Sequence, residues 1–255
     1  MALLEVKDMT KYFGGLCAVS ECSVSIEKGD LVALIGPNGA GKTTVFNLVS
    51  GFYTPTSGDI LFRGESIKGL KPHSVTGKGI ARTFQNIRLW FDMTVLDNIR
   101  VSQHFHLGYG VLDCFLRTPR YMRREKEIED LAMEILEALN LRAHAHEKPS
   151  NLPYGVQRRV EIARALSVGP DLLMLDEPAA GLNSADVDGL IKLIRWIHER
   201  YGIAIWMIEH QMDVVMSLCS WIKVVDFGAT IAEGTPEQIQ NNPEVIKAYL
   251  GDDTI

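Results

Sequence analysis

The fold of this 255-residue chain is decided by the stretch Leu31-Val-Ala-Leu-Ile-Gly36-Pro-Asn-Gly-Ala-Gly41-Lys42-Thr43. Its first five residues form a continuous apolar run, which is typical of a buried strand in a parallel sheet. Residues 36–43 match the pattern GxxxxGK[ST] in full, and the segment that follows, as far as Gly51, is compatible with a helix. A strand, a glycine-rich loop and a helix in this order predict a phosphate-binding P-loop.

Each residue type in this loop has a physical role. Glycines let the backbone turn tightly enough to point several N–H groups at phosphate oxygens, and the helix behind adds its positive end. Lys42 is expected to bridge the β- and γ-phosphates, while the hydroxyl of Thr43 is expected to contact magnesium. The loop predicts nucleotide binding without saying what the nucleotide is used for. The residues expected to surround the phosphates are Gly36, Pro37, Asn38, Gly39, Ala40, Gly41, Lys42, Thr43 and Thr44.

A second element with chemical potential is the apolar run Asp171-Leu-Leu-Met-Leu-Asp176-Glu177-Pro178, which ends in two adjacent carboxylates. At the end of a strand the chain turns, so both carboxylates can reach one site. We expect Asp176 to hold magnesium and Glu177 to orient or deprotonate an attacking water. An Asp-Glu pair alone can equally be a solvated turn; its combination with a P-loop favours the catalytic interpretation.

The remaining pattern indicates an open α/β sheet that carries a helical insertion. Short continuous apolar runs separated by a helix-compatible segment imply a right-handed crossover between parallel strands. Charge-rich residues followed by apolar residues at helical spacing indicate helices from about residue 95 to 166. The expected strands are Leu4–Met9, Cys22–Ile26, Leu31–Ile35, Ile60–Phe62, Leu172–Leu175 and Ala204–Ile208, and the crossover helix is Asp186–Glu199.

Composition argues against several classes of function. The net charge of -6 provides no basic field for nucleic acid, so we expect no nucleic-acid partner. The apolar runs fall short of the roughly 18 to 20 residues of a membrane span, and the first residues lack a signal-peptide pattern, so a cytoplasmic location is expected. The four cysteines show no CxxC spacing, which argues against a zinc site or a disulfide.

Further elements make the whole chain resemble an ABC transporter nucleotide-binding domain. Gln85 stands where that family has its Q-loop glutamine, which contacts magnesium and water, and His210 stands where it has its switch histidine. Residues 180–183 resemble the D-loop. Phe13 matches the aromatic residue that stacks on adenine, with Tyr12 as the competing candidate. The resemblance implies a P-loop NTPase fold of the ABC type: a mostly parallel core sheet, an N-terminal antiparallel β region and an inserted helical subdomain.

The signature motif of this family, Leu-Ser-Gly-Gly-Gln, is altered here. The corresponding residues are Leu152, Pro153, Tyr154, Gly155 and Val156, which retain only the leucine and the second motif glycine. In the family this motif binds the γ-phosphate held by a second subunit, and proline offers neither a hydroxyl nor an N–H. Loss of that contact would cost about 1.5 to 3 kcal/mol, so we expect weak nucleotide-driven dimerisation, with N–H groups still offered by residues 154 and 155.

Several stretches resemble one branch of the family, the LivG-type subunits of branched-chain amino-acid importers. They are Phe13-Gly-Gly-Leu, Thr83-Phe-Gln, Met174-Leu-Asp-Glu-Pro-Ala-Ala-Gly-Leu-Asn, Gly234-Thr-Pro-Glu-Gln-Ile and Ala248-Tyr-Leu-Gly. The long segment from about Val101 to Glu125 also resembles that branch. Importers for urea or other amides use similar subunits and stay open as an alternative.

The resemblance implies one domain over residues 1–255, with the helical subdomain at about 87–165, that hydrolyses ATP with Mg²⁺ to drive import. The implied catalytic residues are Glu177, His210 and Gln85, and the implied metal ligands are Thr43, Gln85 and Asp176. The implied partners are a second ABC subunit, identical or related, membrane permease subunits at the cytoplasmic face, and indirectly a solute-binding protein outside the membrane. A soluble ABC ATPase that acts on DNA or ribosomes is the alternative of another class; such proteins usually carry coiled-coil insertions or two cassettes, which this sequence lacks.

Overall fold

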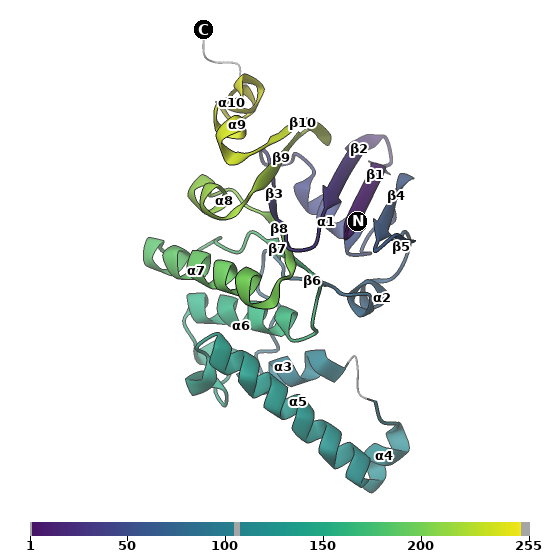
Figure 1. Cartoon of the computed structure of the whole chain (residues 1–255), viewed down its shortest axis with the longest axis vertical. Coiled ribbons are helices and arrows are strands. Elements are labelled where there is room, and N and C mark those ends of the chain that lie inside the picture. The colour runs from purple at the N-terminus through teal and green to yellow at the C-terminus, as the bar shows by residue number, and fades with distance from the viewer. Residues whose placement is uncertain (1, 105–107, 251–255) are drawn as a thin grey trace. The chain divides into compact units, whose positions relative to one another are not determined.

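The computed structural model describes residues 2–104 and 108–250. The chain divides into two compact units. The first combines Met1–Gln85 with Asp171–Ile255, and the second is Asn86–Pro170. Figure 1 shows the elements of both units.

The first unit contains all the strands of the described residues, arranged in two sheets. The four-stranded sheet has the order β2-β1-β4-β5 and is antiparallel throughout. The six-stranded sheet has the order β10-β9-β3-β8-β7-β6, and only its β9–β10 pair is antiparallel. The strands are β1 (Leu4–Phe13), β2 (Leu16–Ile26), β3 (Leu31–Ile35), β4 (Ser57–Phe62), β5 (Glu65–Ser66), β6 (Ile80–Arg82), β7 (Leu172–Asp176), β8 (Ala204–Ile208), β9 (Trp221–Asp226) and β10 (Ala229–Gly234).

The parallel strands β3, β7 and β8 are buried along their whole length, as their uninterrupted apolar sequences predict. Their register pairs Leu34 with Ile208 and Asp176 with Ile208, so the three strands end at one edge of the sheet. The chain leaves these ends at Gly36, Glu177 and Glu209. The topology therefore brings three segments far apart in sequence to one place, which is where open α/β sheets bind their ligands.

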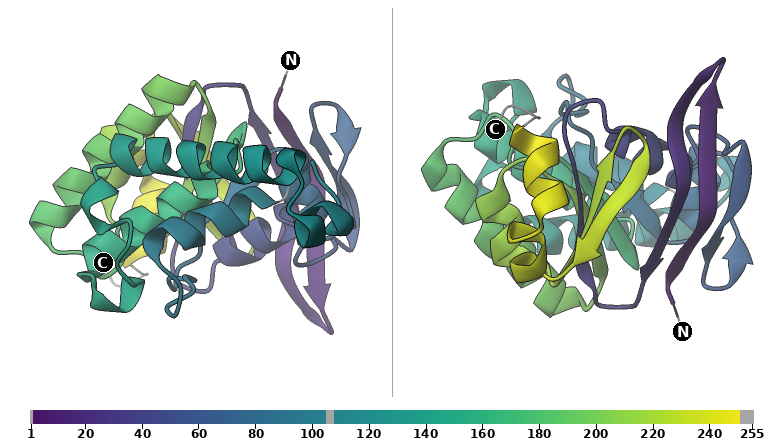
Figure 2. Two further views of the ribbon diagram at one scale, coloured as in Figure 1. Left: turned by 90° about the horizontal axis from the view of Figure 1, so that it is seen from below. Right: turned by 90° about the horizontal axis from the view of Figure 1, so that it is seen from above.

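The helices of the first unit pack on these sheets. Phe46 of α1 and Trp206 of β8 are both fully buried, and their ring centroids lie 4.9 Å apart. Strand β10, at one edge of the six-stranded sheet, lies next to β2, at one edge of the four-stranded sheet, so the two sheets meet there (Figure 2). The helices are α1 (Lys42–Val49), α2 (Pro72–Gly77), α7 (Ser184–Tyr201), α8 (Met212–Leu218), α9 (Pro236–Gln240) and α10 (Pro243–Leu250).

The second unit is helical. It contains α3 (Val95–Gln103), α4 (Val111–Leu116), α5 (Pro119–Ala138), the short 3-10 helices η2 (Arg142–His144) and η3 (Pro149–Asn151), and α6 (Tyr154–Leu166). Helices α3, α5 and α6 pack against one another through buried side chains such as Ile99, Leu136 and Val160. The hydroxyl oxygen of Thr118 accepts a hydrogen bond from the Tyr121 backbone N–H, which caps the start of α5.

The predicted fold class is confirmed: a mostly parallel sheet, an antiparallel β region near the N-terminus and a helical insertion. Strand β1 continues beyond the predicted end at Met9 as far as Phe13, because residues 11–13 pair with β2. In the described part of the chain, no helix has both the length and the apolar character needed to span a bilayer.

Candidate nucleotide-binding site

A cavity of about 610 Å³ opens in the first unit, beside the ends of the parallel strands. The P-loop forms one wall, Glu177 after β7 and His210 beyond β8 form another, and the adjoining ends of β1 and β2 complete it. The residues that line it are Phe13, Leu16, Cys17, Ala18, Asn38, Gly39, Ala40, Gly41, Lys42, Thr43, Thr44, Gln85, Glu177, His210, Phe227 and Gly228. Most of the predicted phosphate-binding residues thus share one cavity with Gln85, Glu177 and His210.

Two glycines of the P-loop are required by close backbone contacts. Gly36 has φ 152°, and a Cβ there would overlap the carbonyl oxygen of Val225 in β9. Gly41 has φ 97°, and a Cβ there would overlap the carbonyl oxygen of Ala18. Both neighbours are backbone atoms, so no side-chain movement would relieve the overlap. The loop is therefore held tightly between β9 and β2, with α1 starting at Lys42.

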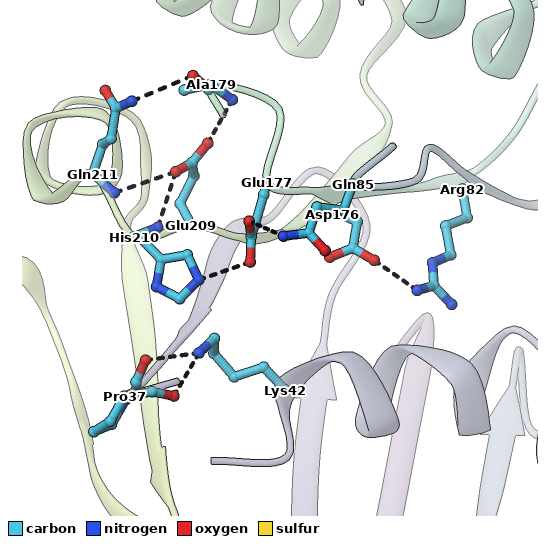
Figure 3. Close-up of polar contacts among 11 residues, drawn as sticks. Pro37, Lys42, Arg82, Gln85, Asp176, Glu177, Ala179, Glu209, His210 and Gln211 are labelled. Carbon is cyan, nitrogen blue, oxygen red and sulfur yellow. Dashed lines mark hydrogen bonds and ion pairs between the residues drawn. The ribbon is translucent and has the colours of Figure 1, made fainter. Parts of the chain in front are cut away.

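Lys42 folds back over its own loop. Its buried Nζ donates hydrogen bonds to the carbonyl oxygens of Gly36 at 2.7 Å and Pro37 at 2.8 Å (Figure 3). Burial lowers the pKa of the ammonium, and the negative charges of Glu177 and Asp176 oppose that shift. The P-loop thus surrounds one cation that faces two carboxylates, an arrangement suited to phosphate oxygens and a metal ion.

Glu177 is held from both sides. Its Oε2 accepts a hydrogen bond from Gln85 Nε2 at 2.7 Å, and its Oε1 lies 2.7 Å from His210 Nε2 (Figure 3). Its backbone has φ 48°, in the left-handed region that a residue with a Cβ rarely adopts. The backbone N–H of Glu177 bonds to the Ile208 carbonyl oxygen, which fastens this strained turn to β8. Strain kept at a site is a feature of functional positions.

Asp176 makes a buried ion pair that the sequence did not predict. Arg82 of β6 donates from Nη2 to Asp176 Oδ2 at 2.6 Å, and the two side chains are only 5% and 3% exposed. Arg82 Nη1 also donates to Asn47 Oδ1 and Ser50 Oγ, each at 2.8 Å, on α1 and its C-cap. Arg82 therefore ties β7 to α1 and fixes the orientation of the Asp176 carboxylate. A single arginine outside any motif carried no signal of this role.

Glu209 is a second residue that the sequence analysis missed. Its buried carboxylate accepts from the backbone N–H of Ala179 at 2.7 Å, of His210 at 2.9 Å and of Gln211 at 3.3 Å (Figure 3). Burial raises its pKa, against the effect of these three donors. Glu209 thereby joins the turn after Glu177 to the turn that carries His210.

The oxygen donors of the site fit a magnesium ion. Thr43 is exposed within the cavity, Gln85 lines it, and Asp176 ends the adjoining strand. Mg²⁺ prefers oxygen ligands and binds through one or two carboxylates together with substrate phosphates and water. Among the described residues no three His, Cys, Asp or Glu side chains cluster as a self-sufficient metal site. The donor set thus suits a metal that arrives with a phosphorylated ligand.

One of the two candidate adenine-stacking residues lines the cavity. Phe13 is 41% exposed, and its ring packs edge-on against Tyr53 with centroids 5.2 Å apart. Of the described residues, Phe13 belongs to the cavity wall and Tyr12 does not. This placement favours Phe13 as the residue that would meet a flat base.

The altered signature residues lie in the second unit, at the start of α6. Pro153 is the residue before the first helical turn, and its carbonyl oxygen accepts from the N–H groups of Val156 and Gln157. Gln157 donates its side-chain amide to the Leu152 carbonyl oxygen at 2.8 Å. The first N–H groups of a helix have no partner within it, so Tyr154 and Gly155 direct theirs beyond the end of α6.

The family model for ABC transporters matches residues 19–180, which is more than half of the chain. The chain belongs to the ABC transporter family. A second model, described as branched-chain amino acid ATP-binding cassette transporter, matches residues 229–254 of this ABC cassette. The predicted family and, with it, the class of ATP-hydrolysing cassette are therefore confirmed.

Curated relatives cover nearly the whole ABC cassette. The high-affinity branched-chain amino acid transport ATP-binding protein BraF of Pseudomonas aeruginosa is 48% identical over 98% of both chains. The corresponding protein LivG of Escherichia coli K12 is 47% identical over 98% of both chains. A probable LivG of Archaeoglobus fulgidus is 36% identical over 98% of this chain and 96% of its own.

Solved structures agree with these relatives. A nucleotide-free ATP-binding cassette from an ABC transporter matches with a TM-score of 0.86 and 32% identity, covering 99% of this chain and all of its own. The ADP conformation of an ATP-binding cassette of an ABC transporter matches with a TM-score of 0.85 and 31% identity, at the same coverage.

The ABC cassette also builds its site from a turn that motif analysis did not single out for binding. Phe227 and Gly228 connect β9 to β10 and line the cavity. The Gly228 N–H donates to the Ala40 carbonyl oxygen at 3.0 Å, and its own carbonyl accepts from the Ser20 N–H at 2.8 Å. The β9–β10 turn therefore supports the P-loop from behind. No local pattern reveals this, because the contact joins residues far apart in sequence.

Proposed function

We propose that this ABC cassette couples ATP hydrolysis at Glu177 to the import of branched-chain amino acids through a membrane permease. The observation that carries the catalytic part is the Glu177 carboxylate, held by Gln85 and His210 in the same cavity as Lys42. The names of relatives at 46 to 48% identity over nearly the full length support the choice of substrate.

In this proposal the P-loop and Lys42 bind the β- and γ-phosphates, and Phe13 stacks on adenine. Thr43, Gln85 and Asp176 would hold Mg²⁺, which supplies neutralisation of charge on the phosphate oxygens. Glu177 accepts a hydrogen bond from the attacking water and places that water in line with the γ-phosphate. Gln85 and His210 keep the carboxylate in position, because each holds one of its two oxygens.

We further propose that residues 1–255 form one nucleotide-binding domain, which works as a pair with a second ABC subunit, identical or related. Leu152, Pro153, Tyr154 and Gly155 of one subunit would face the γ-phosphate bound by the other. Backbone N–H groups at the start of α6 can contact that phosphate, since a helix N-terminus favours anions. Pro153 provides no such donor, so the closed pair should be held weakly.

The partners that follow from this role are permease subunits, which keep the cassette at the cytoplasmic face of the membrane, and a solute-binding protein on the other side. Closure around ATP and opening after hydrolysis would pass to the permease through the Gln85 region and the helical unit. No observation favours a nucleic-acid or ribosomal role.

Uptake measurements test this function. Cells of the source organism that lack the chain should lose uptake of labelled leucine, and restoring the wild-type chain should recover it. The Glu177→Gln variant should not recover uptake, while Glu199→Gln, a change of an exposed carboxyl on α7, should. Normal leucine uptake with lost urea uptake would contradict the branched-chain assignment and favour an amide importer.

A further inference from the structure

Helix α4 of the second unit presents its apolar side chains to solvent. The exposed fractions are 73% for Val111, 76% for Leu112, 82% for Phe115 and 75% for Leu116. Their spacing of one, three and one residues places them on a single face of the helix. These four residues are called the apolar tip below. The helical unit leaves this cluster uncovered. Clustered exposed apolar residues mark interaction surfaces.

The polar groups beside the apolar tip are used in holding it. Asp113 accepts hydrogen bonds from the Gly110 N–H at 3.0 Å and from the Thr118 hydroxyl at 2.9 Å. The Tyr109 hydroxyl donates to Glu125 of α5 at 2.6 Å, and its ring packs edge-on against Tyr121. Asp113 and Tyr109 thus tie α4 to α5. Figure 1 shows α4 beside one end of α5. The orientation of the apolar tip is therefore built into the fold.

The surroundings of the apolar tip are basic, although the whole chain carries a net charge of -6. Residues 111–126 contain two acidic residues, Asp113 and Glu125, and both are engaged in the contacts just described. The basic residues of the same segment are Arg117, Arg120, Arg123, Arg124 and Lys126. Arg124 and Arg123 lie 2.9 Å and 4.0 Å from Glu127, and the side chains of Arg117, Arg120, Arg123 and Lys126 are exposed. The apolar tip is therefore bordered by more basic than acidic side chains.

Such a combination suits a lipid surface that carries negative headgroups. Apolar side chains enter the boundary between headgroups and acyl chains, while arginine and lysine reach the phosphates with long flexible stems. Each basic residue near an anionic surface adds attraction on the order of 1 kcal/mol.

We propose that the apolar tip of α4 inserts into the interface of an anionic lipid bilayer, with the arginines at the start of α5 bound to lipid phosphates. This contact goes beyond the proposed transport function, because it needs neither nucleotide nor permease. It gives the cassette a second attachment to the membrane, made by its own residues.

Sedimentation with protein-free vesicles tests the contact. One set consists of phosphatidylcholine, and the other contains about one third phosphatidylglycerol, comparable to an anionic leaflet. The wild-type protein should bind the anionic vesicles and be released by salt. Leu112→Ser with Phe115→Ser should weaken binding by about tenfold or more, since the apolar area is removed. Leu112→Ile with Phe115→Leu should retain binding to the vesicles. Leu131→Ser should retain it too, because this exposed leucine lies on α5, outside the apolar tip.

Charge is tested separately. Arg120→Gln with Arg123→Gln should weaken binding to the anionic vesicles about tenfold and leave binding to phosphatidylcholine unchanged. ATP hydrolysis by the serine variant should equal that of the wild type, which separates this contact from the catalytic proposal. Absence of wild-type binding to both vesicles, or equal binding by the serine variant, would overturn the proposal. Binding only to native membranes that contain protein would overturn it in favour of a protein partner.

Discussion

The Oε1 atom of Glu177 lies 2.7 Å from the Nε2 atom of His210, beyond the ends of the paired strands β7 and β8. Since a carboxylate only accepts hydrogen bonds, the hydrogen must be carried by His210 Nε2. The other oxygen of Glu177 is held by Gln85. Both oxygens of the carboxylate are therefore held, which would give an attacking water a fixed place in the proposed reaction.

This relationship predicts the kinetics of two variants. His210→Ala and Gln85→Ala should each lower kcat for ATP hydrolysis about 10- to 100-fold, the equivalent of about 1.5 to 3 kcal/mol for a charge-assisted hydrogen bond. KM for ATP should change little in His210→Ala, because this side chain acts on Glu177, whereas Gln85→Ala also removes a proposed Mg²⁺ ligand and should raise KM. Steady-state kinetics of both variants and of the double variant check this. His198→Ala removes a comparable histidine contact to the Gly29 carbonyl oxygen, far from Glu177 in sequence, and should leave kcat unchanged.

Two Arg–Asp pairs allow a matched test of burial. Arg82–Asp176 is almost completely buried, whereas Arg63–Asp171 has side chains 54% and 31% exposed. Arg82→Met should lower the free energy of unfolding by about 3 to 5 kcal/mol, because it leaves a buried carboxylate without its counter-charge. Arg63→Met should cost about 0 to 1 kcal/mol. Urea unfolding of both variants measures the difference, and similar losses would contradict the structural role of Arg82.

The backbone strain at Glu177 predicts an unusual order of stabilities. A backbone φ of 48° is unstrained for glycine and strained for alanine. The free energy of unfolding of Glu177→Gly should therefore exceed that of Glu177→Ala by about 1 kcal/mol. At Glu134, an exposed position inside α5, glycine should instead be the less stable by about 1 kcal/mol. Thermal or urea unfolding of the four variants compares the two orders. The same order at both positions would show that Glu177 is unstrained.

Glu209 predicts a dependence of stability on pH. Burial raises the pKa of Glu209 in the folded chain above its value in the unfolded chain. The contribution of Glu209 to the free energy of unfolding is therefore complete below the unfolded pKa and is lost as the pH rises through the folded pKa. Glu209→Gln should cost about 1 to 3 kcal/mol at neutral pH, since an amide cannot accept all three backbone donors. In urea unfolding, the difference in the free energy of unfolding between wild type and Glu209→Gln should widen as the pH falls from 7 towards 4. A gap that narrows would mean that the three donors outweigh burial.

Much of the architecture followed from local sequence. Continuous apolar runs marked β3, β7 and β8 to within a residue, because strands buried on both faces leave no room for polar positions. The end of β1 was missed because residues 10–12 carry polar groups, and pairing with β2 and β4 keeps them extended. Pairing between strands depends on tertiary structure, which a local pattern does not contain.

The residues of the candidate site likewise fall into those that the sequence predicted and those that only the structure shows. Lys42, Thr43, Asp176 and Glu177 belong to contiguous motifs whose spacing itself reflects their chemistry. Arg82 and Glu209 act through burial and through partners distant in the sequence, and neither has a sequence signature. The exposed face of α4 was likewise hidden, because an apolar residue in a helix is ordinarily expected to be buried.

The central claim is that Glu177 is the carboxylate that activates water for ATP hydrolysis. It is tested most directly by phosphate release from purified wild type, Glu177→Gln and Glu199→Gln, with ATP binding measured in the same samples. We predict that Glu177→Gln binds ATP as tightly as the wild type while releasing phosphate at least about 100-fold more slowly, the range of a general base. Glu199→Gln should behave as the wild type. Phosphate release by Glu177→Gln at the wild-type rate would contradict the account.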